Sequence, residues 1–334
     1  MPINEPCQLY PYKKVHLPVH KNFMRKIYGY FKAFWKEEVK LPYLLVIVGF
    51  LALSIFLEYN YKLTANLIGP HRKTISHFYA YIIFYSIPVF FSVLAYIYFY
   101  KRSDLFKNST FWLVLAFIIC AFSFRGYVYQ HKDWITELNN GVVDNYLIRS
   151  ANQLFRALLI FLLVFIFWKV SGHSRKTVFY GFKLKGVDIK PYFILLALMV
   201  PLIAVASTQP DFLRKYPTFA TIIKESIYDP VVMAKLALYE ILYGFDYVAI
   251  ELFFRGFVLY AISRFLGKGA IIPMATMYVF IHFGKPMGET ISSFFGGVIL
   301  GVIAYETNSI VGGIIVHCGI AYMMEIGGFL GNGM

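Results

Sequence analysis

Residues 245–257 read FDYVAIELFFRGF, in which Glu251 and Arg255 stand one helical turn apart among apolar and aromatic side chains. The apolar run around them, residues 231–263, exceeds the roughly 20 residues that a helix needs to cross a bilayer. Ionisable side chains are costly in lipid, and those that occur there usually face the interior of a helix bundle. The stretch therefore predicts a membrane helix whose polar face is turned towards neighbouring helices.

The composition of the whole chain also predicts a membrane protein. Of the 334 residues, 59% are hydrophobic and 15% are charged, whereas soluble domains carry about 25% charged residues. We predict an all-α, polytopic transmembrane bundle of eight or nine segments, of which 110–124 and 270–283 are short for full spans. The candidates are residues 41–60, 77–100, 110–124, 153–170, 192–208, 231–263, 270–283, 290–305 and 309–330.

Charge and polarity divide the chain into three parts. Residues 1–40 form a basic cytoplasmic arm, in which residues 22–39 mix aromatic and basic side chains. This mixture is typical of an amphipathic helix on anionic lipid, and the alternative is an extension of the first span. Residues 41–230 form a transmembrane scaffold with almost no ionisable groups inside its segments. Residues 231–334 hold most of the intramembrane polar groups, and we assign the functional core to them.

The net charge of +14 bears on partners and orientation. In a soluble protein it would suggest nucleic acid. Here the basic residues lie in loops, so we expect no nucleic-acid partner and expect contact with anionic lipid. The positive-inside rule places the N-terminus in the cytoplasm, and we expect an integral protein of the plasma (inner) membrane. The three cysteines are far apart and form no disulfide framework or zinc-finger spacing.

Two histidines join the Glu251–Arg255 pair from other predicted helices. His282 ends the segment 270–283, and His317 lies in 309–330. With a rise of about 1.5 Å per residue, Glu251 and His282 lie at about the same depth, near 20 Å from one end of their helices. Gly297 and Gly301 form a small-xxx-small motif that permits close helix packing. The spacing therefore predicts that the polar groups converge inside the bundle.

Residues 245–325 resemble the core of the CPBP/Abi family, which comprises CAAX-type proteases and bacteriocin-processing or immunity proteins. The family pattern is Glu-Glu-x-x-x-Arg, then Phe-x-x-x-His, a glycine-rich helix, and His-x-x-x-Asn or Asp. Glu251 and Arg255 fit the first motif, His282 fits the second with Tyr278 in place of the Phe, and His317 begins the last. The resemblance implies a CAAX-protease-like helical core and peptide-bond hydrolysis by a water that Glu and His activate.

Two positions depart from the family pattern. Ile250 stands where the first Glu is expected, and Ala321 stands where the final Asn or Asp is expected. Asp246 lies four residues before the first gap and Glu325 four residues after the second. We therefore predict a shifted set in which Asp246 and Glu325 join the other site residues. Its members are Asp246, Glu251, Arg255, His282, His317 and Glu325.

The function predicted from these residues is an intramembrane endopeptidase that cuts a membrane-associated or lipidated peptide. Glu251 or Asp246 acts as general base with His282, while the groups at 255 and 317 stabilise an oxyanion or hold the structure. The departures leave open a non-catalytic protein that binds a peptide or partner in immunity or regulation. No cofactor is certain. A third alternative is a zinc hydrolase with His282, His317 and Glu251 as ligands, although no His-Glu-x-x-His is present. A transporter is the alternative outside the family.

Overall fold

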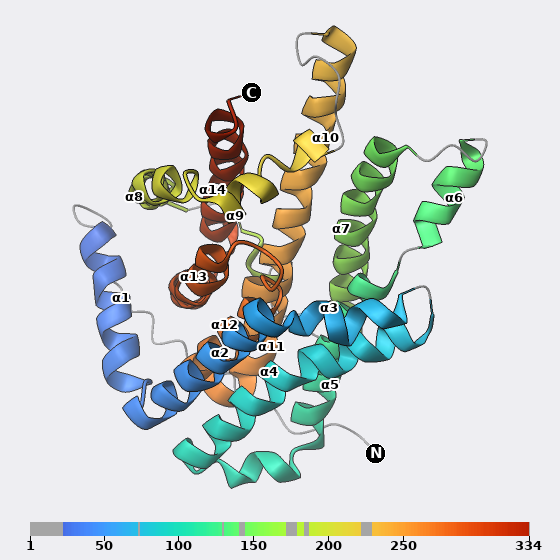
Figure 1. Ribbon diagram of the computed structural model, residues 1–334. Helices are drawn as coiled ribbons and strands as arrows, with labels where there is room; N and C mark the ends of the chain where they lie inside the picture. Colours follow the sequence, from blue (N-terminus) through green and yellow to red (C-terminus); the bar gives the residue numbers. More distant parts are fainter. Residues whose placement is uncertain are drawn as a thin grey trace.

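The computed structural model describes residues 23–72, 74–128, 130–139, 144–171, 179–183, 187–221 and 229–333. Within these ranges the regular elements are all helical, which confirms the predicted all-α fold (Figure 1). The α-helices are α1 (Phe23–Glu37), α2 (Leu41–Tyr61), α3 (Leu63–Ile68), α4 (Ser76–Tyr100), α5 (Ser109–Tyr127), α6 (Gln130–Leu138), α7 (Asn145–Val170), α8 (Lys190–Ala206), α9 (Pro210–Lys215), α10 (Pro230–Glu251), α11 (Leu259–Leu266), α12 (Ile271–Phe280), α13 (Met287–Thr307) and α14 (Val311–Gly331).

Each of the nine predicted apolar segments is helical in the structure. Among the described residues, six helical stretches are long and apolar enough to cross a membrane, namely α2, α4, α5 counted together with α6, α7, α13 and α14. α8 is a shorter apolar helix. α10 passes through the π-helical turn Leu252–Val258 into α11, so that the three together form one long element. This architecture confirms the helical membrane bundle.

Polar side chains set the starts of the long helices. Asp229 precedes α10, and its Oδ1 accepts hydrogen bonds from the backbone N–H groups of Val231 and Val232. Asp144 caps α7 in the same way. Such residues satisfy N–H groups that have no partner within the helix, and the proline at position 230 needs none. The long element that carries Glu251 therefore begins at a fixed position.

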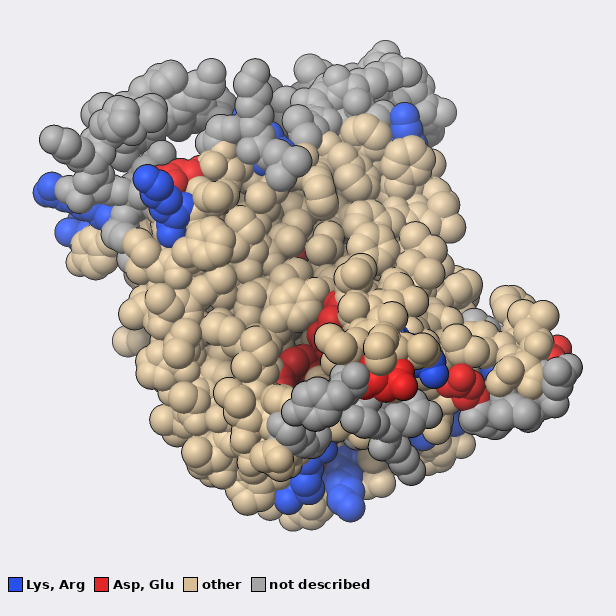
Figure 2. Space-filling model, turned by 90° about the horizontal axis from the view of Figure 1, so that it is seen from above, with Lys and Arg blue, Asp and Glu red and all other residues tan. Residues whose placement is uncertain are grey.

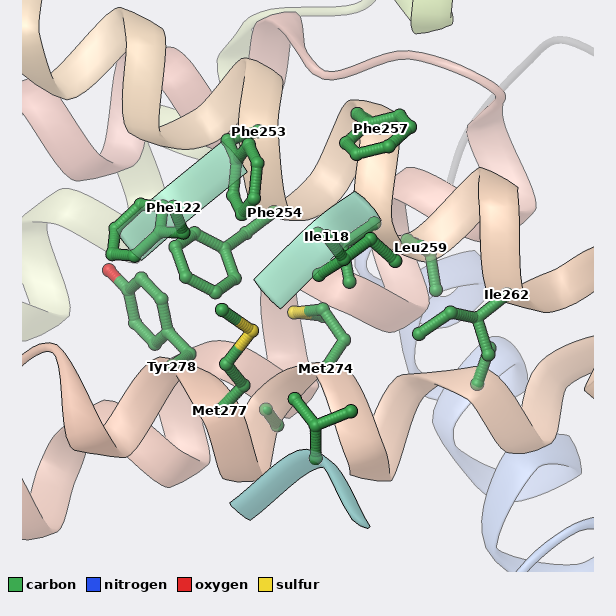
Figure 3. Close-up of a cluster of buried hydrophobic side chains, with 14 of the residues drawn as sticks. Ile118, Phe122, Phe253, Phe254, Phe257, Leu259, Ile262, Met274, Met277 and Tyr278 are labelled. Atoms are coloured by element: carbon green, nitrogen blue, oxygen red, sulfur yellow. The ribbon is translucent and has the colours of Figure 1, made fainter. Parts of the chain in front are cut away.

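α12 is the centre of the packing around the site. All ten of its residues are buried, and it contacts α4, α13 and the α10–α11 element. Its Tyr278 ring meets the Phe254 ring at 5.1 Å between centroids, and Phe254 in turn meets Phe122 of α5 at 5.3 Å. Figure 3 shows Tyr278 at the edge of this cluster, with its hydroxyl pointing away from Met274 and Met277. The aromatic core thus holds the tyrosine in place.

The glycine motif of α13 brings this helix close to α12, as the sequence predicts. A Cβ atom at Gly297 would lie 3.1 Å from the Cβ of Ala275, and one at Gly301 would lie 2.8 Å from the Cε of Met274. Any larger side chain at these positions would push the two helices apart. The close packing of α12 and α13 therefore keeps the residues of α13 near the turn that follows α12.

The N-terminal arm contains the predicted amphipathic helix, which is α1. Its Ile27 and Phe34 are buried, and the helix packs on α13, while Arg25, Lys32 and Lys36 are exposed. Residues 1–22 of the arm lie outside the described residues. The division into arm, scaffold and core remains a prediction, because one hydrophobic cluster joins residues from all three parts.

Candidate active site

Glu251 is the centre of a fully buried polar group. Its Oε1 lies 2.8 Å from Nη1 of Arg255 and 2.8 Å from Nδ1 of His317. Neither Glu251 nor Arg255 has any exposed surface. The group therefore joins the end of α10 to α14, and it brings together three of the predicted site residues.

Two local features make room for the Glu251 carboxylate. The helix changes to π-helical geometry directly after Glu251, and single π-helical turns occur frequently at functional sites. Across from it, α14 presents Gly313, where a Cβ atom would lie only 2.4 Å from Oε2 of Glu251. A glycine is therefore required at this close approach.

Tyr278 completes the group on the α12 side. Its hydroxyl lies 3.0 Å from Nε2 of His317. Glu251 accepts a hydrogen bond from Nδ1–H of His317. In the neutral ring, Nε2 then carries the lone pair and accepts a hydrogen bond from the Tyr278 hydroxyl. The Arg255 guanidinium lies 4.0 Å from the centroid of the same tyrosine ring, a cation–π contact. Both ring nitrogens of His317 are thus occupied, which suits a positioning role.

His282 lies in the turn between α12 and α13. Its Nδ1 is 2.9 Å from the backbone oxygen of Tyr278, so that Nδ1–H donates and Nε2 carries the lone pair. Thr290 donates a hydrogen bond to the His282 backbone oxygen at 2.8 Å, and Tyr59 donates one to the Lys285 backbone oxygen at 2.6 Å. The turn is therefore fixed, and one imidazole nitrogen is left to act as a base.

Glu289, in the first turn of α13, is a site residue that the sequence interpretation missed. Its Oε1 lies 4.0 Å from Nε2 of His282 and accepts a hydrogen bond from Nζ of Lys285 at 2.7 Å. Its Oε2 accepts one from the Tyr216 hydroxyl at 2.8 Å. Burial lowers the pKa of Lys285, but Glu289, Tyr247 and Tyr278 together raise it more, so the pKa lies above its ordinary value. The signal for this residue was its position only seven residues after His282.

The structure does not assemble the predicted shifted set. Asp246 pairs with Arg125 of α5, at 2.5 and 2.7 Å from its two oxygens, and Glu325 accepts a hydrogen bond from the backbone N–H of Thr218 at 2.7 Å. A helix turns about 100° per residue, so Asp246 points about 140° away from Glu251. Glu325 lies about 12 Å along α14 from His317 by the same geometry. Neither acid fills the gap left by Ile250 or Ala321 in the described structure.

The described residues do not fit the zinc alternative. Within the described ranges, no group of three or more His, Cys, Asp or Glu side chains is placed to hold a metal ion. The two ring nitrogens of His317 contact Glu251 and Tyr278 instead. The ligand set of His282, His317 and Glu251 is therefore not formed.

A carboxylate, a guanidinium and two imidazoles buried within a bundle of apolar helices mark a candidate functional site. Residues 234–323 match the family model described as type II CAAX prenyl endopeptidase Rce1-like. The match includes Glu251, Arg255, His282, Glu289 and His317. It is consistent with membership of the CPBP/Abi family and confirms the resemblance predicted from the sequence. Six apolar helices together with this match identify an integral membrane protein.

Comparison with the curated proteins and with the solved structures gave no match. The resemblance to a protease family therefore depends on the matched segment, residues 234–323.

Proposed function

We propose that this protein is an intramembrane endopeptidase that hydrolyses a peptide bond in a membrane-associated or lipidated peptide. The observation that carries the proposal is the fixed His282, whose Nε2 lone pair lies beside a carboxylate. The match to an endopeptidase family supports the same class of reaction. A histidine with one nitrogen anchored and the other free is suited to general acid–base chemistry.

The roles of the other residues follow from their contacts. His282 orients a water molecule and receives its proton, or shares it with a carboxylate, as the water oxygen attacks the peptide carbonyl carbon. Glu251 is fully buried and engaged by two partners, so we assign it, with Arg255 and His317, to holding Tyr278 and α14 in position. These four side chains form a rigid wall behind the reacting groups.

An apolar groove supports a membrane-associated or lipidated substrate. It has a volume of about 800 Å³ and lies between α1, α2, α12 and α13. Tyr59, Val279 and Met287 line the end of the groove that borders the turn carrying His282. An extended apolar chain in this groove would lead its polar end towards the histidine. The exposed basic residues of α1 support contact with anionic lipid, and we propose a cytoplasmic N-terminus in the plasma (inner) membrane.

The test compares peptide termini in membranes that express the wild type or His282→Ala at matched levels of folded protein. Alanine removes the imidazole that is proposed to act on the water and leaves the Glu251–Arg255 pair in place. We expect new termini with the wild type and few or none with the variant. Identical profiles would instead support the non-catalytic binding protein that Ile250 and Ala321 suggest. Cleavage that appears only after Ile250→Glu would support that alternative as well.

A further inference from the structure

Ile250 leaves the proposed reaction without its expected carboxylate. This side chain is buried within the hydrophobic cluster and has no acid–base chemistry. The two acids in this part of α10 already have partners. Glu251 pairs with Arg255, and Asp246 pairs with Arg125. A base that acts with His282 must therefore come from another element.

Glu289 of α13 meets the geometric requirement. Its Oε1 and Nε2 of His282 are 4.0 Å apart, which is too long for a direct hydrogen bond, whose limit is about 3.2 Å. Both atoms are acceptors, because the carboxylate has no proton and the imidazole proton is on Nδ1. Two acceptors at this separation are suited to receive the two protons of one water molecule.

The surroundings hold the Glu289 side chain in one orientation. Lys285 donates to Oε1 at 2.7 Å, and the Tyr216 hydroxyl donates to Oε2 at 2.8 Å. The positive end of the α13 dipole favours a negative charge in its first turn. The side chain is 14% exposed, compared with 0% for Glu251, so water reaches the first carboxylate and not the second.

Acidic side chains are present on one face of the molecule. Figure 2 shows acidic atoms recessed within a mainly apolar face. The face is the one seen from above, on the side where α10 begins and α14 ends in Figure 1.

We propose that Glu289 is the general base of this site and supplies from α13 the carboxylate that position 250 lacks. This inference rests on the proposed peptidase function. Glu289 takes one proton from the bridging water while the water oxygen bonds to the peptide carbonyl carbon and the carbonyl oxygen becomes an oxyanion. The proton then passes to the amide nitrogen as the C–N bond breaks. The products are a carboxylic acid and an amine, and Glu289 returns to its ionised form.

The decisive variant is Glu289→Gln, which keeps the size of the side chain and its ability to accept hydrogen bonds but removes its basicity. A matched control is Glu306→Gln on the same helix. Glu306 pairs with Lys268 at 2.7 Å and is 20% exposed, so the two acids differ mainly in their distance from His282. Lys285→Met is the second comparison, because it removes the ion pair of Glu289 and leaves the carboxylate.

The assay follows the rate at which new peptide termini appear in membranes that contain equal amounts of folded protein. We expect Glu289→Gln to lower this rate by about 10²–10⁴-fold, the usual contribution of a general base. Glu306→Gln should cleave like the wild type, and Lys285→Met should lose less than about tenfold, because the carboxylate remains.

Three results would count against the proposal. If the wild type cleaves and Glu289→Gln cleaves within a few-fold of it, the role of Glu289 is wrong and the peptidase function stands. If Lys285→Met and Glu289→Gln lose activity equally, the carboxylate serves only as an ion-pair partner. If the wild type yields no termini beyond those of His282→Ala, the peptidase function fails and the role of Glu289 fails with it.

Discussion

Replacing Gly313 by alanine tests whether the Glu251 carboxylate is rigidly held. The added Cβ atom would lie 2.4 Å from Oε2, and Cβ atoms essentially never approach another atom closer than 3.0 Å. The carboxylate must therefore move by about 0.6 Å or more. The other oxygen lies 2.8 Å from Arg255 in an ion pair and 2.8 Å from His317 in a hydrogen bond. Such a shift lengthens the ion pair and takes the hydrogen bond beyond its good range.

The expected cost comes from the buried charges that lose their partner. Breaking a buried ion pair costs about 3–5 kcal/mol, and weakening one buried hydrogen bond costs about 1–3 kcal/mol. Because the contacts lengthen without disappearing, we expect Gly313→Ala to lower the free energy of unfolding by about 3 kcal/mol. Denaturant unfolding of the purified protein in detergent measures this change.

Two further variants control the experiment. Gly296→Ala adds a Cβ atom on α13 where no other atom lies within 4 Å, and it should leave the stability unchanged within about 1 kcal/mol. Glu251→Asp withdraws the carboxylate from α14, so Gly313→Ala should cost about 1–2 kcal/mol less in that background. Unchanged stability of Gly313→Ala in the otherwise wild-type protein would refute a rigidly held carboxylate.

Three other predictions concern residues around the site. Tyr278→Phe leaves Nε2 of His317 without its hydrogen-bond donor and should lower the free energy of unfolding by about 1–2 kcal/mol. Its cleavage rate per folded molecule should stay within about tenfold of the wild-type rate, since the family pattern has Phe at this position. Asp246→Asn should destabilise the protein by about 2–3 kcal/mol, because it breaks the ion pair with Arg125. Its cleavage rate per folded molecule should equal that of the wild type. A hundredfold loss of rate would instead indicate that Asp246 acts as a base. Cleavage should survive chelators, and a loss that added zinc reverses would contradict this account of the site.

Much of this arrangement follows from helical spacing in the sequence. Glu251 and Arg255 share a helix face because they are four residues apart, and the predicted depths of Glu251 and His282 agree to within a few ångströms. The Gly297–Gly301 motif predicted a close helix contact, and the structure shows that its partner is α12. These features depend only on local geometry and on the high cost of polar groups in lipid.

Other features depend on tertiary contacts that spacing does not specify. Asp246 was predicted from its distance to a gap in the family pattern, but the angle around α10 turns it towards Arg125. Glu289 lies in the turn-proximal end of α13, where no helical periodicity relates it to His282. The hydrogen bond between Tyr278 and His317 required both α12 and α14 to lie beside the α10–α11 element, which the motif alone does not give.

The most direct measurement uses the purified protein, reconstituted in lipid vesicles with a peptide that spans a cleavage site found in the membrane comparison. The rate of cleavage is measured for the wild type and for His282→Ala at equal concentrations of folded protein. We expect cleavage by the wild type and a loss of at least about 100-fold in the variant. Equal rates for the two proteins, or no cleavage by either, would contradict a peptidase site built on His282.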